Sequence, residues 1–220
     1  LAVTANTAAG SGGGMILLSS PAELLSNTVA TNRAAYWGGG LCLNESDVTL
    51  AGNVVYANTI TGLYGGGIAM GGSTVTLVEN DIYSNTAIEY GGGLFLNDSY
   101  VTLSANTFAG NSVSKQGGGL YLSSGSTAKA TNDVIVDNRA GESGTALYVN
   151  GAVFRGRHTT IARNVGGDGI GICATKDWGE VNSTISLTNS IIVSHTVGIS
   201  VSHGQTATLR GTLWHGNAVT

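Results

Sequence analysis

Short segments of alternating apolar and polar residues return at a regular interval along the chain. Each begins with a glycine-rich anchor and continues with alternating apolar residues, at residues 12–17, 38–43, 65–70, 91–96 and 117–122, with weaker copies from Gly144, Gly167 and Thr196. The starts are separated by 26, 27, 26, 26, 27, 23 and 29 residues. A sustained period of this length is the sequence signature of a solenoid.

A second motif, an apolar residue followed by two variable residues and Asn, lies midway between the anchors. It occurs at residues 29–32, 55–58, 82–85, 108–111, 135–138, 161–164 and 214–217, and residues 192–195 carry His in place of Asn. A short alternating segment precedes it, beginning at Val48, Val75, Val101, Ile185 and Ala207. Each period therefore contains three strand-like segments, and no ten-residue stretch has the apolar spacing of a helix.

Alternation places one residue of each strand on the same face as the residue two positions on. One inward set begins the strand after the anchor, at Leu41, Ile68, Leu94, Leu120 and Leu147. A single coil cannot bury this face, but coils stacked about 4.8 Å apart can. The sequence predicts an all-β fold, a right-handed single-stranded parallel β-helix of about eight coils with three parallel sheets, in which residues 1–220 form one domain.

The Asn series of the second motif predicts a ladder at one turn of the coil. Asn tolerates left-handed backbone conformations, and its amide can bond to the residues above and below. We expect this ladder to point inward, with its centre at Asn58, Asn85, Asn111 and Asn138. A row of ligand-binding amides is the alternative interpretation.

Two rows of aromatic residues flank the anchor turn. Trp37, Tyr64 and Tyr90 immediately precede the triple glycine. The predicted outward row of the following strand consists of Ile16, Cys42, Ala69, Phe95, Tyr121, Tyr148, Gly171 and Ser200. The two rows predict one contiguous, exposed aromatic surface, and a surface of this kind usually marks a contact site, here for a glycan or another partner. Stacked rings that only stabilise the coils are the alternative.

Composition narrows the class of partner. The net charge is −4, only 10% of residues are charged, and no apolar run is long enough to span a membrane. We therefore expect neither nucleic-acid binding nor membrane insertion by this segment.

Cys42 and Cys173 lie five coils apart, which predicts two free thiols.

The pairing of Gly-Gly-Gly-aliphatic with apolar-x-x-Asn resembles the polymorphic outer membrane protein repeat, which is known by its GGA[ILV] and FxxN tetrads. The resemblance covers essentially all 220 residues, although the third anchor residue is usually Gly here and only Phe108 supplies the Phe. It implies a pectate-lyase-like right-handed β-helix of a secreted or cell-surface protein. Members of this type are commonly adhesins or surface passengers.

Catalytic motifs such as HExxH, G-x-S-x-G and the phosphate loop are absent, and we expect no metal and no cofactor. An inserted segment, residues 175–183, carries charged residues that could perform acid–base chemistry on a glycan together with a histidine of the next coil. The candidates are Lys176, Asp177, Glu180 and His203. A solvated loop is the alternative interpretation, and the scatter of Asp81, Asp133, Asp137, Asp168 and Asp177 over different repeat positions argues against an enzyme.

Lys129, Arg155 and Arg157 are predicted to lie on adjacent coils of one sheet, where they could bind an acidic polysaccharide. Surface charge that protects the sheet is the alternative.

The chain opens inside a coil and stops just after an Asn motif, without a polar cap at either end. We therefore expect it to belong to a longer solenoid or to make end-to-end contact with another chain.

These observations favour an extracellular or cell-surface module without catalytic activity, which acts as an adhesin, a stalk or a glycan-contacting surface. The expected partner is a polysaccharide or a cell-surface glycan. The alternative is a polysaccharide lyase or glycoside hydrolase of the pectate-lyase-like type.

Overall fold

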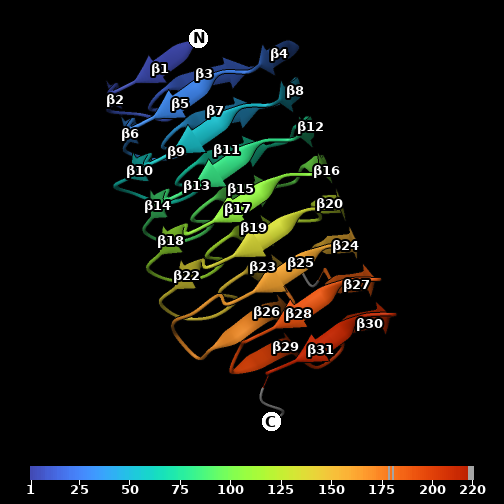
Figure 1. Ribbon diagram of the computed structural model, residues 1–220. Helices are drawn as coiled ribbons and strands as arrows, with labels where there is room; N and C mark the ends of the chain where they lie inside the picture. Colours follow the sequence, from blue (N-terminus) through green and yellow to red (C-terminus); the bar gives the residue numbers. More distant parts are fainter. Residues whose placement is uncertain (178, 180, 218–220) are drawn as a thin grey trace.

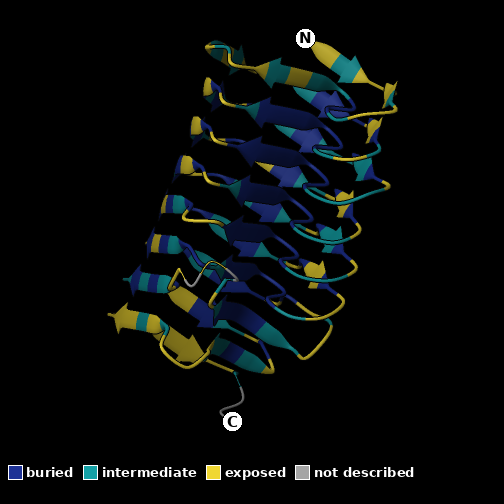
Figure 2. Cartoon of the chain, turned by 180° about the vertical axis from the view of Figure 1, so that it is seen from behind, coloured by how far each residue is buried: buried dark blue, intermediate teal, exposed yellow. Residues whose placement is uncertain are grey.

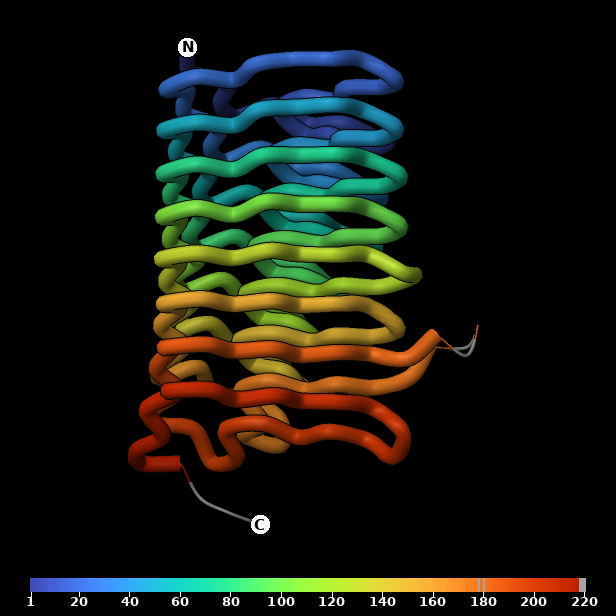
Figure 3. The backbone as a smooth tube through the Cα atoms, turned by 90° about the vertical axis from the view of Figure 1, so that its right-hand side faces the viewer, coloured from blue at the N-terminus to red at the C-terminus, as the bar shows by residue number. Residues whose placement is uncertain are grey.

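The computed structural model describes residues 1–177, 179 and 181–217. Within these residues the chain winds as a stack of coils, and the N-terminus and the last described coil lie at opposite ends of the stack (Figures 1 and 3). Every strand pairs in parallel with the strand one coil away, which confirms the predicted parallel β-helix. The strands form four sheets, here called A, B, C and D in the order in which each coil passes through them.

Sheet A contains the apolar residue of the apolar-x-x-Asn motif. Its nine strands are β1 (Ala2–Thr4), β5 (Thr28–Ala30), β9 (Val54–Tyr56), β13 (Asp81–Tyr83), β17 (Thr107–Ala109), β21 (Val134–Val136), β25 (Thr160–Ala162), β28 (Ile191–Val193) and β31 (Leu213–His215). The middle residue of each strand points inward, and from Val29 to Ile192 this row is buried. At the end of the row Trp214 is 36% exposed, because no described coil covers it.

Sheet B is a fourth sheet, so the prediction of three sheets was wrong. Its six strands have only two residues each: β2 (Thr7–Ala8), β6 (Arg33–Ala34), β10 (Thr59–Ile60), β14 (Thr86–Ala87), β18 (Ser112–Val113) and β22 (Arg139–Ala140). Two residues are too few to reveal alternation in the sequence. The second residue of the central strands forms a small apolar cluster of its own, from Ile60 to Ala140.

Sheet C follows the glycine-rich anchor. Its eight strands are β3 (Met15–Leu18), β7 (Leu41–Asn44), β11 (Ile68–Gly71), β15 (Leu94–Asn97), β19 (Leu120–Ser123), β23 (Leu147–Asn150), β26 (Ile170–Thr175) and β29 (Val197–Val201). The register agrees with the predicted rows as far as Leu147. In the next coil Tyr148 pairs with Cys173 and not with Gly171, because paired residues there are 25 positions apart (172 − 147) and not the 23 that the anchor spacing predicted.

Sheet D completes the coil. Its eight strands are β4 (Ala22–Leu25), β8 (Asp47–Ala51), β12 (Thr74–Val78), β16 (Tyr100–Ser104), β20 (Thr127–Thr131), β24 (Val153–Arg157), β27 (Thr184–Thr188) and β30 (Thr206–Arg210). Together with sheets A and C it encloses one continuous apolar core, which contains the predicted inward residues and appears as the dark interior in Figure 2. The two terminal coils have only one neighbour each and are more exposed.

The predicted Asn ladder is present and points inward between sheets A and B. The Oδ1 atom of Asn111 accepts hydrogen bonds from the backbone N–H and the Nδ2 of Asn85, at 3.1 and 3.0 Å. Its own Nδ2 donates to the carbonyl of Ile82 at 2.9 Å and to Asn138 at 3.0 Å. The same pattern repeats from Asn6 to Asn164, so the ladder satisfies buried polar groups at a turn where no strand pairing can do so.

His195 continues this ladder with an imidazole. Its Nδ1 lies 3.2 Å from Oδ1 of Asn217, and its Nε2 lies 3.2 Å from Nδ2 of Asn164. An amide oxygen can only accept and an amide nitrogen only donates, so these contacts assign a neutral ring protonated at Nδ1. Burial lowers the pKa of His195, which favours this neutral form.

A second ladder, which the sequence analysis did not predict, lies between sheets D and A. It consists of Asn27, Asn53, Asn80, Asn106 and Asp133. Ser46, Ser73, Ser99 and Ser126 form a third row at the turn between sheets C and D. Three of the four turns of the coil thus carry hydrogen-bonded side chains that repeat from coil to coil.

Replacing Asn111 with Ala is expected to lower the free energy of unfolding by about 1–3 kcal/mol, because the donors of Asn85 and the carbonyl of Ile82 lose their buried partner. Thermal unfolding measures the change. Asn44→Ala is the matched control, since this partly exposed Asn makes no side-chain hydrogen bond to the described residues. An equal effect of the two variants would show that the ladder bonds add nothing to stability.

Both cysteines are free, as predicted, and the structure shows that both are buried. Among the described residues there is no helix that is long and apolar enough to cross a membrane.

Candidate functional site

The aromatic residues form one contiguous cluster on the outer face of sheet C. Phe95, Tyr121 and Tyr148 lie in the middle of their strands, and Trp37, Tyr64 and Tyr90 come from the preceding turn, where parallel bridges join successive coils. Each turn residue leans over the strand residue of the next coil. The ring centroids are 4.6 Å apart for Tyr64 and Phe95 and 4.5 Å apart for Tyr90 and Tyr121.

The cluster is contiguous as predicted, but its strand row is not exposed. Phe95, Tyr121 and Tyr148 are only 3%, 4% and 8% exposed: Tyr64 stacks on Phe95, Tyr90 stacks on Tyr121, and Tyr148 stacks on Tyr121. The half-buried rings of Trp37, Tyr64 and Tyr90 are therefore the aromatic surface that remains available to a ligand.

Small residues determine where Trp37 lies. Ala69 and Gly71 occupy the strand of the next coil, and a Cβ atom on Gly71 would lie only 3.2 Å from Cζ3 of Trp37. The indole therefore crosses sheet C from the turn to its far edge and meets Phe95 edge to face, with ring centroids 5.5 Å apart. It closes the N-terminal end of the cluster.

A polar rim faces the aromatic rings across the sheet. Asn97, Ser123 and Asn150 end three successive strands of sheet C and line a groove of about 280 Å³ together with the rings. Nδ2 of Asn150 donates to Oη of Tyr121 at 3.3 Å, and burial raises the pKa of Tyr121 so that its hydroxyl stays protonated. The groove is smaller and more open than an enclosed small-molecule pocket. Its form suits a ligand that lies along the surface.

One edge of the cluster carries opposite charges. Nζ of Lys115 lies 2.6 Å from Oε1 of Glu89 and 5.9 Å from the centre of the Tyr90 ring. Gln116 follows Tyr90 in the turn row and donates to Glu142 at 3.1 Å. This edge is therefore held by polar contacts between neighbouring coils.

The basic residues also lie where the sequence placed them. Lys129, Arg155 and Arg157 are exposed on the outer face of sheet D, and Lys129 pairs in register with Arg155. They line one groove together with Thr131, Ser186 and Thr188. Nζ of Lys129 lies 5.0 Å from the centre of the Tyr100 ring.

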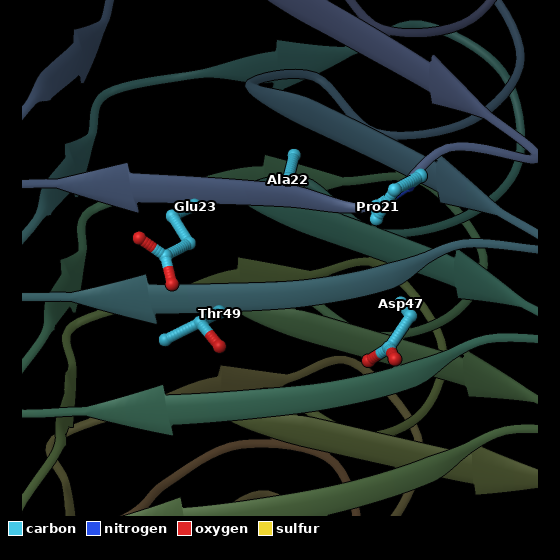
Figure 4. A pocket seen from close by; sticks show the side chains of 5 residues that line it. All are labelled: Pro21, Ala22, Glu23, Asp47 and Thr49. Atoms are coloured by element: carbon cyan, nitrogen blue, oxygen red, sulfur yellow. The ribbon is translucent and has the colours of Figure 1, made fainter.

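A third hollow lies at the N-terminal end of the same sheet. It is lined by Pro21, Ala22, Glu23, Asp47 and Thr49, and Figure 4 shows the two carboxylates on neighbouring strands, one toward each end of the hollow. Among the described residues no group of three or more His, Cys, Asp or Glu side chains is arranged to hold a metal ion. The two carboxylates alone do not define a site.

Three of the four predicted acid–base candidates, Lys176, Asp177 and His203, lie within the described residues. Lys176 is exposed, and Oδ1 of Asp177 accepts a hydrogen bond from the backbone N–H of Val181 at 2.8 Å. His203 is exposed, and neither a hydrogen bond nor an ion pair joins it to Asp177 in the described part of the chain. Glu180 lies outside the described residues.

Comparison with known proteins agrees with the architecture. The profile of the family described as "Right handed beta helix region" matches residues 1–165. The chain belongs to this family of right-handed β-helices. No curated protein matches the sequence. The resemblance to the polymorphic outer membrane protein repeat thus remains a resemblance of motifs within this β-helix family.

Among solved structures, the β-helix is similar to the crystal structure of the periplasmic alginate epimerase AlgG, with 13% sequence identity and a TM-score of 0.49. The match covers 86% of this chain and 60% of that chain. The β-helix described here thus spans about three-fifths of the length of that protein.

Proposed function

We propose that this β-helix is a glycan-contacting module of an exported or cell-surface protein and that it acts without catalysis, as an adhesin or a stalk does. The observation that carries the proposal is the aromatic groove on sheet C. Half-buried rings of Trp37, Tyr64 and Tyr90 face a rim of amides and a hydroxyl across one open groove. Sugar rings present C–H groups on their faces and hydroxyls at their edges, so they match both sides of such a groove.

The rigidity of the groove supports the same proposal. Its rings stack on buried neighbours, and its rim residues stand at strand ends, so a ligand would order few side chains on binding. Preorganised surfaces of this kind lose little free energy to immobilisation. The repeat also presents similar groups on successive coils about 4.8 Å apart, which suits an extended polymer better than a single small molecule.

The test is an array of neutral and acidic oligosaccharides, probed with the wild type and a Tyr64→Ala, Tyr90→Ala double variant. We expect the double variant to lose about tenfold or more in affinity for the glycan that the wild type binds, since about 1.4 kcal/mol corresponds to tenfold. Asn97→Ala should also weaken binding while leaving the melting temperature unchanged.

A matched control exists on sheet A. Tyr56 and Tyr83 are stacked with ring centroids 5.1 Å apart, much as Tyr64 and Tyr90 are at 5.3 Å, but they lie on a different face. A Tyr56→Ala, Tyr83→Ala variant, which removes an equal number of stacked tyrosine rings, should keep its binding. Absence of glycan binding by the wild type, or equal losses in both double variants, would refute the proposal.

A further inference from the structure

Four of the nine Lys and Arg residues of the chain lie on the outer face of sheet D, toward its C-terminal end. Lys129 stands directly beside Arg155 in the parallel register, and Arg157 follows two residues along the same strand. Arg210 lies on the last strand of the sheet. In a protein with a net charge of −4, this is a local concentration of positive charge.

No carboxylate neutralises the patch within the described structure. The two ion pairs there, Lys115–Glu89 and Arg163–Asp137, lie elsewhere. On the adjacent strands, the positions in register with the three cations carry Thr102, Ser186 and Thr188. Like charges on neighbouring strands destabilise a sheet, so Lys129 and Arg155 cost stability as long as no anion lies between them.

The surroundings of the patch supply further hydrogen-bond donors. Hydroxyl groups of Thr131, Ser186 and Thr188 line the same groove as the cations. A guanidinium group presents a planar set of N–H donors that matches the two oxygens of a carboxylate or the oxygens of a sulfate. The cations occupy two positions along the strand, so the groove can hold more than one anionic group.

We propose that the outer face of sheet D over β20, β24 and β27 binds the carboxylate or sulfate groups of an acidic polysaccharide. This inference rests on the proposed function as a glycan-contacting module and specifies the class of glycan. The net negative charge of the chain opposes binding to nucleic acid, whose charge is denser and continuous. An acidic polysaccharide places its charges at intervals on a polyhydroxyl backbone, which the hydroxyls of the groove also suit.

A separate hollow lies at the turn between sheets C and D, which links the strands that carry the aromatic groove to those that carry the basic patch. Tyr100, Ser99 and the carboxylate of Asp98 line this hollow, next to Asn97 of the polar rim. Nζ of Lys129 lies over the ring of Tyr100, 5.0 Å from its centre. A glycan that crosses this turn would contact aromatic rings on sheet C and cations on sheet D.

The experiment measures binding of polygalacturonate, its methyl ester, dextran sulfate, neutral dextran and a short DNA duplex at low ionic strength. The test variant is Arg155→Gln with Arg157→Gln. The control is Arg33→Gln with Arg139→Gln, which removes the same charge from exposed positions on sheet B. We expect the wild type to bind polygalacturonate or dextran sulfate, with binding weakened by added salt. The test variant should bind at least about tenfold more weakly, and the control should bind as the wild type does.

Equal losses in the test variant and the control would indicate non-specific attraction and overturn the inference, as would failure of the wild type to bind either anionic polymer. DNA binding as tight as polygalacturonate binding, with the same dependence on Arg155 and Arg157, would also overturn it. The methyl ester retains the sugar backbone without its charge, so its binding to the wild type should not depend on these arginines. If glycan binding still requires Tyr64 and Tyr90, the proposed function stands even when substitutions in the basic patch have no effect on binding.

Discussion

Replacing Asp133 with Asn is expected to stabilise the protein at neutral pH by about 2–3 kcal/mol. Asp133 is the only carboxylate among the described members of the second ladder. Its Oδ1 accepts hydrogen bonds from the backbone N–H and the Nδ2 of Asn106, at 2.8 and 2.9 Å, as an asparagine would. Its Oδ2 is buried and has no hydrogen-bond partner.

The other ladder residues show what this position requires. Nδ2 of Asn53, Asn80 and Asn106 donates to the backbone carbonyl of Leu24, Leu50 and Leu77, respectively. The carbonyl in register for the next coil is that of Leu103. In Asp133 an oxygen takes the place of this donor, so two acceptors face each other unless the carboxyl carries a proton. Asparagine restores the donor.

The pH dependence follows from the pKa. Burial raises the pKa of Asp133 from 3.8 to about 6, against the hydrogen bonds from Asn106, which lower it. A carboxyl with a raised pKa binds its proton more tightly in the folded state than in the unfolded state. Its contribution to stability is therefore fully present below about pH 4 and is lost as the pH rises through about 6. The two pKa values correspond to about 3 kcal/mol, which sets the upper limit of the effect.

Chemical unfolding of the wild type and Asp133→Asn at pH 4.5 and pH 7.5 measures the effect. The gain in the variant should be large at the higher pH and small at the lower pH. Asn80→Asp is the reverse control, since it introduces a carboxylate at an equivalent buried rung, and it should lose stability at pH 7.5 and recover at pH 4.5. An equal gain at both pH values would attribute the stabilisation to packing and not to the proton.

The regular part of the fold could be predicted because the apolar residues that repeat along the sequence are the same residues that the coils bury. The anchor spacing determined the register of sheet C as far as Leu147, and the Asn of the second motif identified one ladder. The second ladder was also visible, as an Asn or Asp five residues before that motif's Asn, from Asn27 to Asp133. It was not predicted, because Asn and Asp are also ordinary turn residues and a boundary between two strands needs no ladder to explain them.

The exposure of the aromatic groove could not be predicted from spacing. Alternation correctly assigned Phe95, Tyr121 and Tyr148 to the outer face, but outer residues are exposed only when nothing covers them. Whether Tyr64 leans over Phe95 depends on rotamers and on small residues in the neighbouring coil, such as Ala69 and Gly71. Likewise, the coil that ends in β26 is 25 residues long (172 − 147) and not 23 as the anchors predicted, which moves the outward row from Gly171 to Cys173. Both features depend on contacts between coils, which a single repeat does not encode.

Replacing Gly92 with Ala is expected to destabilise the protein severely, at the upper end of the range of about 1–3 kcal/mol typical of overpacking or beyond it. Gly92 is the second glycine of its anchor. A Cβ atom there would lie closer than 3.0 Å to the carbonyl oxygen of Gly118 in the next coil and to the backbone of Ser112. Both obstacles are backbone atoms held by pairing between coils, so neither can move without disrupting the stack.

The matched control for Gly92→Ala is Gly110→Ala, in the same coil. Gly110 has a positive φ of 60°, but the nearest atom to an added Cβ is Oγ of Ser84 at 3.9 Å. At the equivalent turn two coils earlier, Ala57 adopts a φ of 51°. The control should therefore change the free energy of unfolding by less than about 1 kcal/mol, because the strain and the reduced entropy of the unfolded chain offset each other. Thermal and chemical unfolding of both variants separate the effect of a clash between coils from the effect of a positive φ. A large loss of unfolding free energy in Gly92→Ala alone would show that the close approach of successive coils excludes a side chain at this anchor position. Similar small losses in both variants would show that the stack can open locally to admit a methyl group.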